Sequence, residues 1–182
     1  MKEMQKPNLD RLWRVWIKIL PQDGIDGDFK GAVSTIKSQV TEVVSILETN
    51  KVIDWYYFLI HGKDNDPHNL YFDVVFSVKA EVEPEEFLKL TPSYCLEPKH
   101  LDRAFGESIC GINKELLNNE EIEEVWRIIG EQSEWIIHMV NIHKDNELTI
   151  QQFIQLMHFF MNTMGLGNLS RFQLIPPYVF GF

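Results

Sequence analysis

Cysteine, positive charge and long apolar runs are all scarce in this sequence. Two of its 182 residues are cysteines, Cys95 and Cys110, which is too few for a disulfide scaffold or a Cys-rich zinc site. We expect both to be free structural thiols in a reducing compartment. No apolar run reaches the roughly 18 residues of a membrane span, and the polar N-terminus is unlike a signal peptide. These absences predict a cytoplasmic protein that does not contact a membrane.

Basic residues are outnumbered by acidic ones. The chain has 17 Lys and Arg against 27 Asp and Glu, for a formal net charge of −10. Proteins that bind phosphate backbones gain affinity from clustered cations, which release counterions. The nearest approach to a basic cluster is the small group Lys99, His100 and Arg103. The charge balance therefore argues against nucleic acid as a partner.

Familiar catalytic and cofactor motifs are missing as well. There is no Gly-rich phosphate loop and no nucleophile elbow. The segment Asp64–His68 contains residue types that bind metals, but it lacks the longer series of oxygen ligands of a calcium loop. We interpret it as a polar turn, and we expect neither a metal ion nor an organic cofactor.

What the sequence does contain is an aromatic hairpin. Two apolar runs, Trp55–His61 and Leu70–Val78, flank a polar loop with Gly62 and Pro67, which is typical of two antiparallel strands with a longer connection. In the second run, alternate residues from Leu70 to Val78 are apolar. This alternation predicts one face on the core and the other, with Tyr71, Asp73, Val75 and Ser77, partly in solvent.

The other segments predict elements that cover this hairpin. Leu12–Leu20 alternates as a strand does, and an apolar stripe with helical spacing follows it and ends near Asn50. Pro92 and Pro98 argue against any regular element through Thr91–Gly111. We predict one α+β domain over residues 1–182, with a largely antiparallel sheet under helices. The predicted helices are Phe29–Leu47, a short one starting at Pro84, Leu116–His138, and an apolar one from Thr149 to Met164.

A histidine on the last of these helices has two interpretations. His158 lies between apolar residues, so it fits a core histidine whose nitrogens are hydrogen-bonded. It also fits a general acid or base in a semi-apolar cleft, with Asn162 one turn later on the same side. Both interpretations stay open. His61 ends a predicted strand, and from its position alone it fits a side chain that faces water.

Short motifs occur along the chain in an order that is known from one family. The chain resembles the small C-terminal domain of class I lantibiotic dehydratases, which also occurs alone as the thiopeptide-type bacteriocin biosynthesis protein. The motifs that carry the resemblance are the strand around Trp13–Lys18, the amphipathic helix, Tyr57-Phe58-Leu59, the Asp66-Pro67-His68 turn, the series Tyr94, Glu97, Arg103 and Gly106, the Glu131-Gln132-Ser133 helix, and the series His158, Asn162 and Gly165.

The resemblance implies an α+β fold and a lyase-type activity. In the family, this domain eliminates glutamate from glutamylated Ser or Thr of a ribosomally made peptide. It implies His68 or His158 as the proton-transfer group and Arg103 as the clamp for an anion, with His61, Tyr94 and Asn162 on the substrate. Leu70 and Phe72 replace two arginines of the family pattern, which removes positive groups that would stabilise departing glutamate.

Two functions therefore remain from the sequence. The first is an enzyme or accessory domain that acts on or binds a ribosomally made peptide, by elimination or a related modification. The second is a non-catalytic binding or assembly protein on the same fold, which predicts a homo-oligomer or a stable protein partner. It rests on the missing arginines and on an expected surface of aromatic residues: Trp16, Tyr56, Tyr71 and the Phe172–Phe182 tail.

Overall fold

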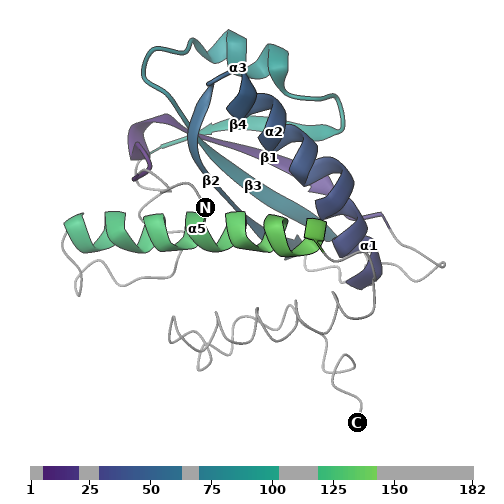
Figure 1. Cartoon of the computed structure of the whole chain (residues 1–182). Helices are drawn as coiled ribbons and strands as arrows, with labels where there is room; N and C mark the ends of the chain where they lie inside the picture. Colours follow the sequence, from purple (N-terminus) through teal and green to yellow (C-terminus); the bar gives the residue numbers. More distant parts are fainter. Residues whose placement is uncertain (1–5, 21–28, 63–69, 103–118, 143–182) are drawn as a thin grey trace.

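The computed structural model describes residues 6–20, 29–62, 70–102 and 119–142 (Figure 1). In this part of the chain it shows an antiparallel sheet with helices, as the α+β prediction requires. The elements are η1 (Leu9–Arg11), β1 (Leu12–Lys18), α1 (Phe29–Thr35), η2 (Ile36–Val40), α2 (Thr41–Thr49), β2 (Ile53–Gly62), β3 (Leu70–Val78), α3 (Pro84–Leu90), β4 (Cys95–Leu101) and α5 (Asn119–Ile142).

The four strands are ordered β2-β3-β1-β4 in the sheet, and every neighbouring pair is antiparallel. The predicted pairing of the two aromatic runs is confirmed, with Phe58 of β2 opposite Val74 of β3. On the other side of β3, Val15 of β1 lies opposite the same Val74. β3 is therefore an interior strand, while β2 and β4 form the two edges.

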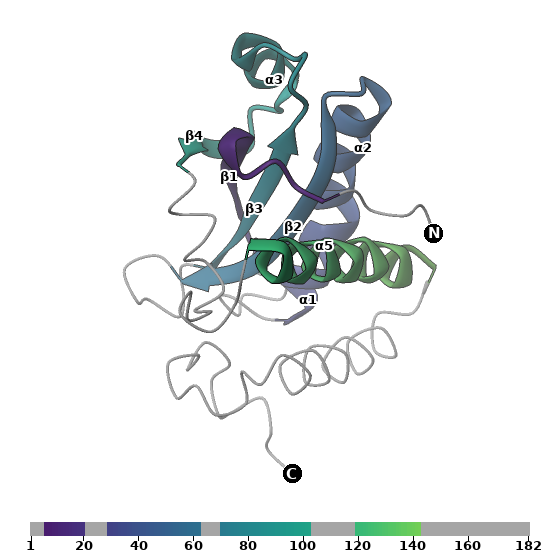
Figure 2. The ribbon, with the colours of Figure 1, turned by 90° about the vertical axis from the view of Figure 1, so that its left-hand side faces the viewer.

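One face of the sheet is covered by the first helical segment and by α3. Figures 1 and 2 show α1 and α2 running along this face. The buried ring of Phe87 in α3 lies 5.2 Å from Trp13 and 5.9 Å from Phe76, measured between ring centroids. Burial of such aromatic and aliphatic surface is the main favourable contribution to folding. The helix residues buried here are Ala32, Val33, Ile36, Val40, Val43, Val44 and Leu47.

The second face of the sheet is also largely buried, which corrects the prediction of a partly solvated side. Tyr71, Val75 and Ser77 of β3 are all buried. At one end of this face, Trp126 of α5 packs against Trp55 and Tyr57, with ring centroids 5.5 and 5.3 Å apart. Alternation alone did not predict this, because an interior strand can have apolar residues on both sides when helices cover both.

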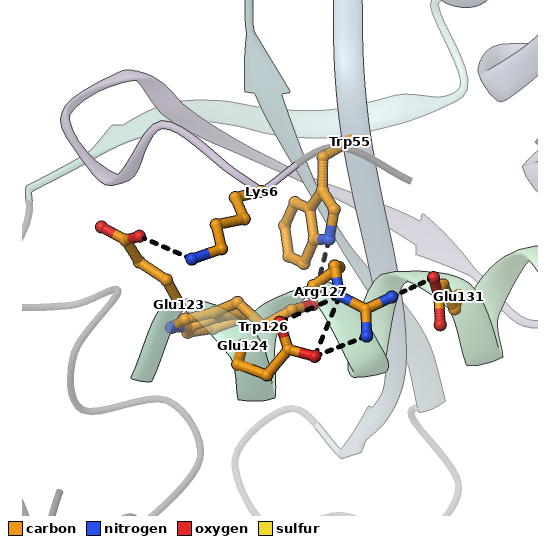
Figure 3. Close-up of polar contacts among 7 residues, drawn as sticks. All are labelled: Lys6, Trp55, Glu123, Glu124, Trp126, Arg127 and Glu131. Atoms are coloured by element: carbon orange, nitrogen blue, oxygen red, sulfur yellow. Dashed lines mark hydrogen bonds and ion pairs between the residues drawn. The ribbon is translucent and has the colours of Figure 1, made fainter. Parts of the chain in front are cut away.

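Helix α5 lies beside the edge strand β2 (Figure 2). The indole Nε1–H of Trp55 donates to the carbonyl oxygen of Trp126 over 3.0 Å (Figure 3). The hydroxyl oxygen of Ser133 accepts a hydrogen bond from the backbone N–H of Phe58 over 3.2 Å, and the hydroxyl donates to the carbonyl of Ile129. An exposed strand edge would present unpaired backbone groups, and the α5 side chain satisfies one of them.

Strand β4 occupies a segment for which we predicted no regular element. That prediction was wrong because Pro98 lies in an edge strand, where a residue without an N–H can face away from the ladder. The pairing with β1 shifts between Arg14 and Trp16, and Glu97 has a positive φ of 49°. A bulge of this kind accommodates the one extra residue of β4.

The long first helix contains a wider turn that its sequence did not predict. Between α1 and α2, η2 is π-helical, and the backbone N–H of Thr41 donates to the carbonyl of Ile36, five residues earlier. The Thr41 hydroxyl donates to the same carbonyl over 2.8 Å. The helix then ends at Thr49 with Asn50 as its C-cap, which confirms the predicted stop. None of the described helices has the length and apolarity to cross a bilayer.

Replacing Ser133 by Ala tests the contact between α5 and β2. We expect Ser133→Ala to lower the free energy of unfolding by about 1–3 kcal/mol, since the buried Phe58 N–H would lose its acceptor. Ser38→Ala is the matched control: its hydroxyl also donates to the carbonyl four residues earlier, but it is exposed and accepts nothing from a strand. Urea denaturation measures both. Equal stabilities of the two variants would show that the Ser133 hydroxyl does not support the strand edge.

Candidate functional site

Most of the predicted site residues lie outside the described part of the chain. His68, Arg103, His158 and Asn162 belong to residues 63–69, 103–118 and 143–182. The roles that the resemblance implies for them therefore stay predictions. His61 lies in β2, opposite Tyr71 of β3 in the strand pairing.

Tyr94, the other predicted substrate-binding residue, is tied to the first helix. Its hydroxyl lies 2.8 Å from Oε2 of Glu42 and 3.1 Å from the carbonyl oxygen of Gln39. Burial raises the pKa of Tyr94, and the adjacent Glu42 carboxylate raises it further. The hydroxyl thus acts as a donor that connects the start of β4 to the π-helical turn. A contact of Tyr94 with substrate remains a prediction.

A charged pair that the sequence did not predict lies on the second face of the sheet. Nε of Arg14 lies 3.9 Å from Oδ1 of Asp73, and both side chains are mostly buried, with exposed fractions of 18% and 17%. The Arg14 guanidinium also lies 4.9 Å from the ring centroid of Trp16, as in a cation–π contact. Arg14 and Asp73 each place a charge among the mostly apolar residues of a strand. These interruptions were the only sign of the pair in the sequence. Without the β1–β3 register, nothing in the sequence placed them together.

The Asp73 carboxyl has an unusual proton affinity. Burial raises its pKa from 3.8 to about 6, and this outweighs the opposing effects of Arg14 and of a hydrogen bond with Trp16. A carboxyl group with a pKa near neutrality can accept and return a proton under physiological conditions. A guanidinium beside it can stabilise an anion. The pair thus provides the two kinds of group that an elimination reaction needs.

Apolar side chains surround this charged pair on the same face. Trp16 lies 5.9 Å from Tyr71 between ring centroids, Leu59 is opposite Asp73, and Leu96 is opposite Trp16. Leu96 is 41% exposed, in contrast to the end of the face that Trp126 covers. We call this set the Arg14–Asp73 face. Its members are Arg14, Trp16, Leu59, Tyr71, Asp73 and Leu96.

Metal and thiol chemistry have little support among the described residues. No group of three or more His, Cys, Asp or Glu in these ranges is arranged to hold a metal ion. Cys95 is a free, buried thiol, as expected, and burial raises its pKa to about 12. A thiol with so high a pKa is almost entirely protonated at neutral pH and is a poor nucleophile.

The acidic start of α5 forms a surface network of ion pairs. Arg127 contacts Glu124 and Glu131, and Nζ of Lys6 lies 3.4 Å from Oε2 of Glu123 (Figure 3). The hydrogen bond with Arg127 lowers the pKa of Glu124. Pairs spaced three or four residues apart stabilise a helix slightly, and exposure limits their strength. We assign this network to the helix and not to a site.

Comparisons of the chain with protein-family models, with curated proteins and with solved structures found no match. The likeness to the lantibiotic dehydratase domain therefore remains a resemblance in the order of short motifs.

The raised pKa of Asp73 predicts how its replacement changes stability with pH. Above pH 6 the folded protein must keep a charged, mostly buried carboxylate that the unfolded chain exposes to water, so the contribution of Asp73 to stability falls between about pH 4 and pH 7. Asp73→Asn removes this loss. Its free energy of unfolding relative to wild type should rise over that range by up to about 3 kcal/mol.

Urea denaturation at several pH values measures this difference. The exposed Glu81 supplies the control variant Glu81→Gln, since solvent screens its charge. A relative stability of Asp73→Asn that decreases toward neutral pH would mean that Arg14 stabilises the carboxylate more than burial penalises it.

Proposed function

We propose that this chain binds a ribosomally made peptide and modifies it, by elimination or a related lyase-type reaction. The observation that supports this best is the Arg14–Asp73 face, where a carboxyl of near-neutral pKa lies beside a guanidinium on the sheet that contains the aromatic hairpin. Elimination needs a base for the α-proton and a cation for the departing carboxylate.

The resemblance supplies the class of substrate. Its first three landmarks coincide with β1, the first helical segment and β2, which belong to one sheet and its covering helix. The fourth, the Asp66-Pro67-His68 turn, lies outside the described residues. In the implied reaction a base removes the α-proton of a glutamylated Ser or Thr. The C–O bond to the glutamyl group breaks, glutamate leaves with the electron pair, and a double bond remains in the peptide.

The two arginines of the family pattern correspond to positions other than Arg14. Leu70 and Phe72 stand where the family has arginines, and Phe72 is buried in the core, so no cation can act there. Arg14 lies on the opposite face of the sheet, by its register with Val75. We propose Arg14 and Asp73 as additional functional groups beside the expected His68, Arg103 and His158.

The assembly hypothesis loses part of its basis. It assumed exposed aromatic side chains, but Tyr56 and Tyr71 are only 3% and 8% exposed, and Trp16 is partly buried against Arg14 and Tyr71. These rings pack within the sheet and do not form an exposed aromatic patch that could bind a partner. Self-association remains an outcome that the experiments below would detect.

A synthetic peptide whose threonine hydroxyl is esterified with glutamate tests the proposal. We expect the wild-type chain to release glutamate and leave a dehydro residue, seen by mass spectrometry as a product one water lighter than the hydrolysed ester. Arg103→Ala should slow this reaction by about tenfold or more, because the loss of one charge-assisted hydrogen bond raises the activation free energy by a corresponding amount. Lys89→Gln, an exposed site on α3, should react as wild type does.

Three results would contradict the proposal or part of it. Hydrolysis without a dehydro product would exclude elimination. Unchanged rates in Arg103→Ala would reject the assignment of Arg103. A chain that is inert toward the peptide and forms a dimer in light scattering would favour the assembly hypothesis instead.

A further inference from the structure

We infer that the Arg14–Asp73 face binds a carboxylate of the peptide substrate, with Arg14 and Lys99 as its two cationic contacts. This inference rests on the proposed peptide function and specifies where, and by which charge, the peptide is held. It assigns a role to Lys99, which neither the motifs nor the resemblance singled out.

The strand register brings the two cations together. Arg14 of β1 lies directly opposite Lys99 of β4. The next pair, Trp13 and His100, has its rings 5.5 Å apart and packs on the first face, near Phe87. Arg14 and Lys99 therefore share the second face. Side chains directly opposite in an antiparallel pair are separated by about 5 Å at Cβ, and the repulsion between like charges in such a pair is reduced by nearby anions. Asp73 is one such anion, and a ligand carboxylate would be a second.

The local charge differs in sign from that of the whole chain. At this end of the face the register places Arg14, Lys18 and Lys99, and Asp73 is the one carboxylate among the strand-paired residues described there. Glu97, which is exposed, lies in the β4 bulge outside the paired register. In a chain with a net charge of −10, a positive end of one sheet face is complementary to an anionic ligand.

Arg14 is held in position before any ligand arrives. Its guanidinium stacks on Trp16 and lies near Asp73, and little of the side chain is exposed. A cation that is already ordered loses less conformational entropy on binding than a flexible surface lysine. Lys99, in contrast, is exposed and can close onto a ligand from the edge strand.

The apolar residues next to the two cations favour a carboxylate that is attached to an organic group. Trp16 and Leu59 are partly buried and Leu96 is exposed, so apolar area lies next to the cations. A small inorganic anion would contact the two cations but would leave the apolar area exposed to water. An acidic side chain or a peptide C-terminus would use both.

Binding of N-acetylglutamate to the full chain, measured by calorimetry, tests the site. Its neutral amide, N-acetylglutamine, and inorganic phosphate are the comparison ligands. We expect Lys99→Gln to weaken N-acetylglutamate binding by about threefold to fivefold, as befits an exposed charge. Arg14→Gln should weaken it by about tenfold or more. Lys89→Gln carries the same charge change on α3 and should bind as wild type does. Lys99 is exposed, so its variant remains informative even if Arg14→Gln fails to fold.

The outcomes separate this inference from the proposed function. Loss of binding in Lys99→Gln supports the site even where no dehydro product forms from the glutamylated peptide. Equal binding by Lys99→Gln and Lys89→Gln overturns the site even where the product forms. Failure of wild type to bind N-acetylglutamate, equal binding of the neutral amide, or equal binding of phosphate would also overturn the assignment to a peptide carboxylate.

Discussion

Burial of β3 on both of its sides is the constraint on which the rest of the described structure depends. Phe72, Val74 and Phe76 require cover on one side, and Tyr71 and Val75 on the other. Each fully buried aliphatic or aromatic side chain contributes about 1.5–3 kcal/mol relative to exposure. One helical layer therefore cannot suffice. The first helical segment and α3 cover one side, and α5 covers one end of the other.

The same constraint explains where charge can be tolerated. At the covered end of the second face, Trp126 packs on Trp55 and Tyr57, and all three side chains are buried. Arg14 and Asp73, whose Nε and Oδ1 atoms are 3.9 Å apart, lie on the same face. Buried charges of this kind cost stability unless they are well compensated. A chain that retains them at such a position accepts that cost, which is common at sites of function.

Local patterns predicted the elements well and the contacts between them poorly. The alternation of Leu70–Val78, the stripe from Phe29 and the Pro84 start each reflect short-range geometry, and each matches an observed element. The strand around Pro98 was missed because its tolerance for proline depends on being at an edge, which is a property of the whole sheet.

The charged pair was missed for a similar reason. Arg14 and Asp73 are 59 positions apart in the sequence, and only the register between β1 and β3 makes them neighbours. The partial solvation predicted for Tyr71 and Ser77 failed because both are buried by contacts with other elements. Tyr71 packs against Trp16 of β1, and the Ser77 hydroxyl accepts a hydrogen bond from the backbone N–H of Asn8. Tertiary packing overrides such patterns.

The π-helical turn has a consequence for how the first helix tolerates changes of length. A turn from Ile36 to Val40 holds about one residue more than an α-helical turn, while the apolar sides of α1 and α2 both still meet the sheet. Shortening the chain by one residue within this turn would convert it to ordinary α-helix and leave both halves oriented as they are. The same deletion elsewhere in the helix would rotate one half by about 100° and turn polar side chains into the core. Natural variation in length within this helix is thus expected to concentrate at the turn that the Tyr94 hydroxyl contacts.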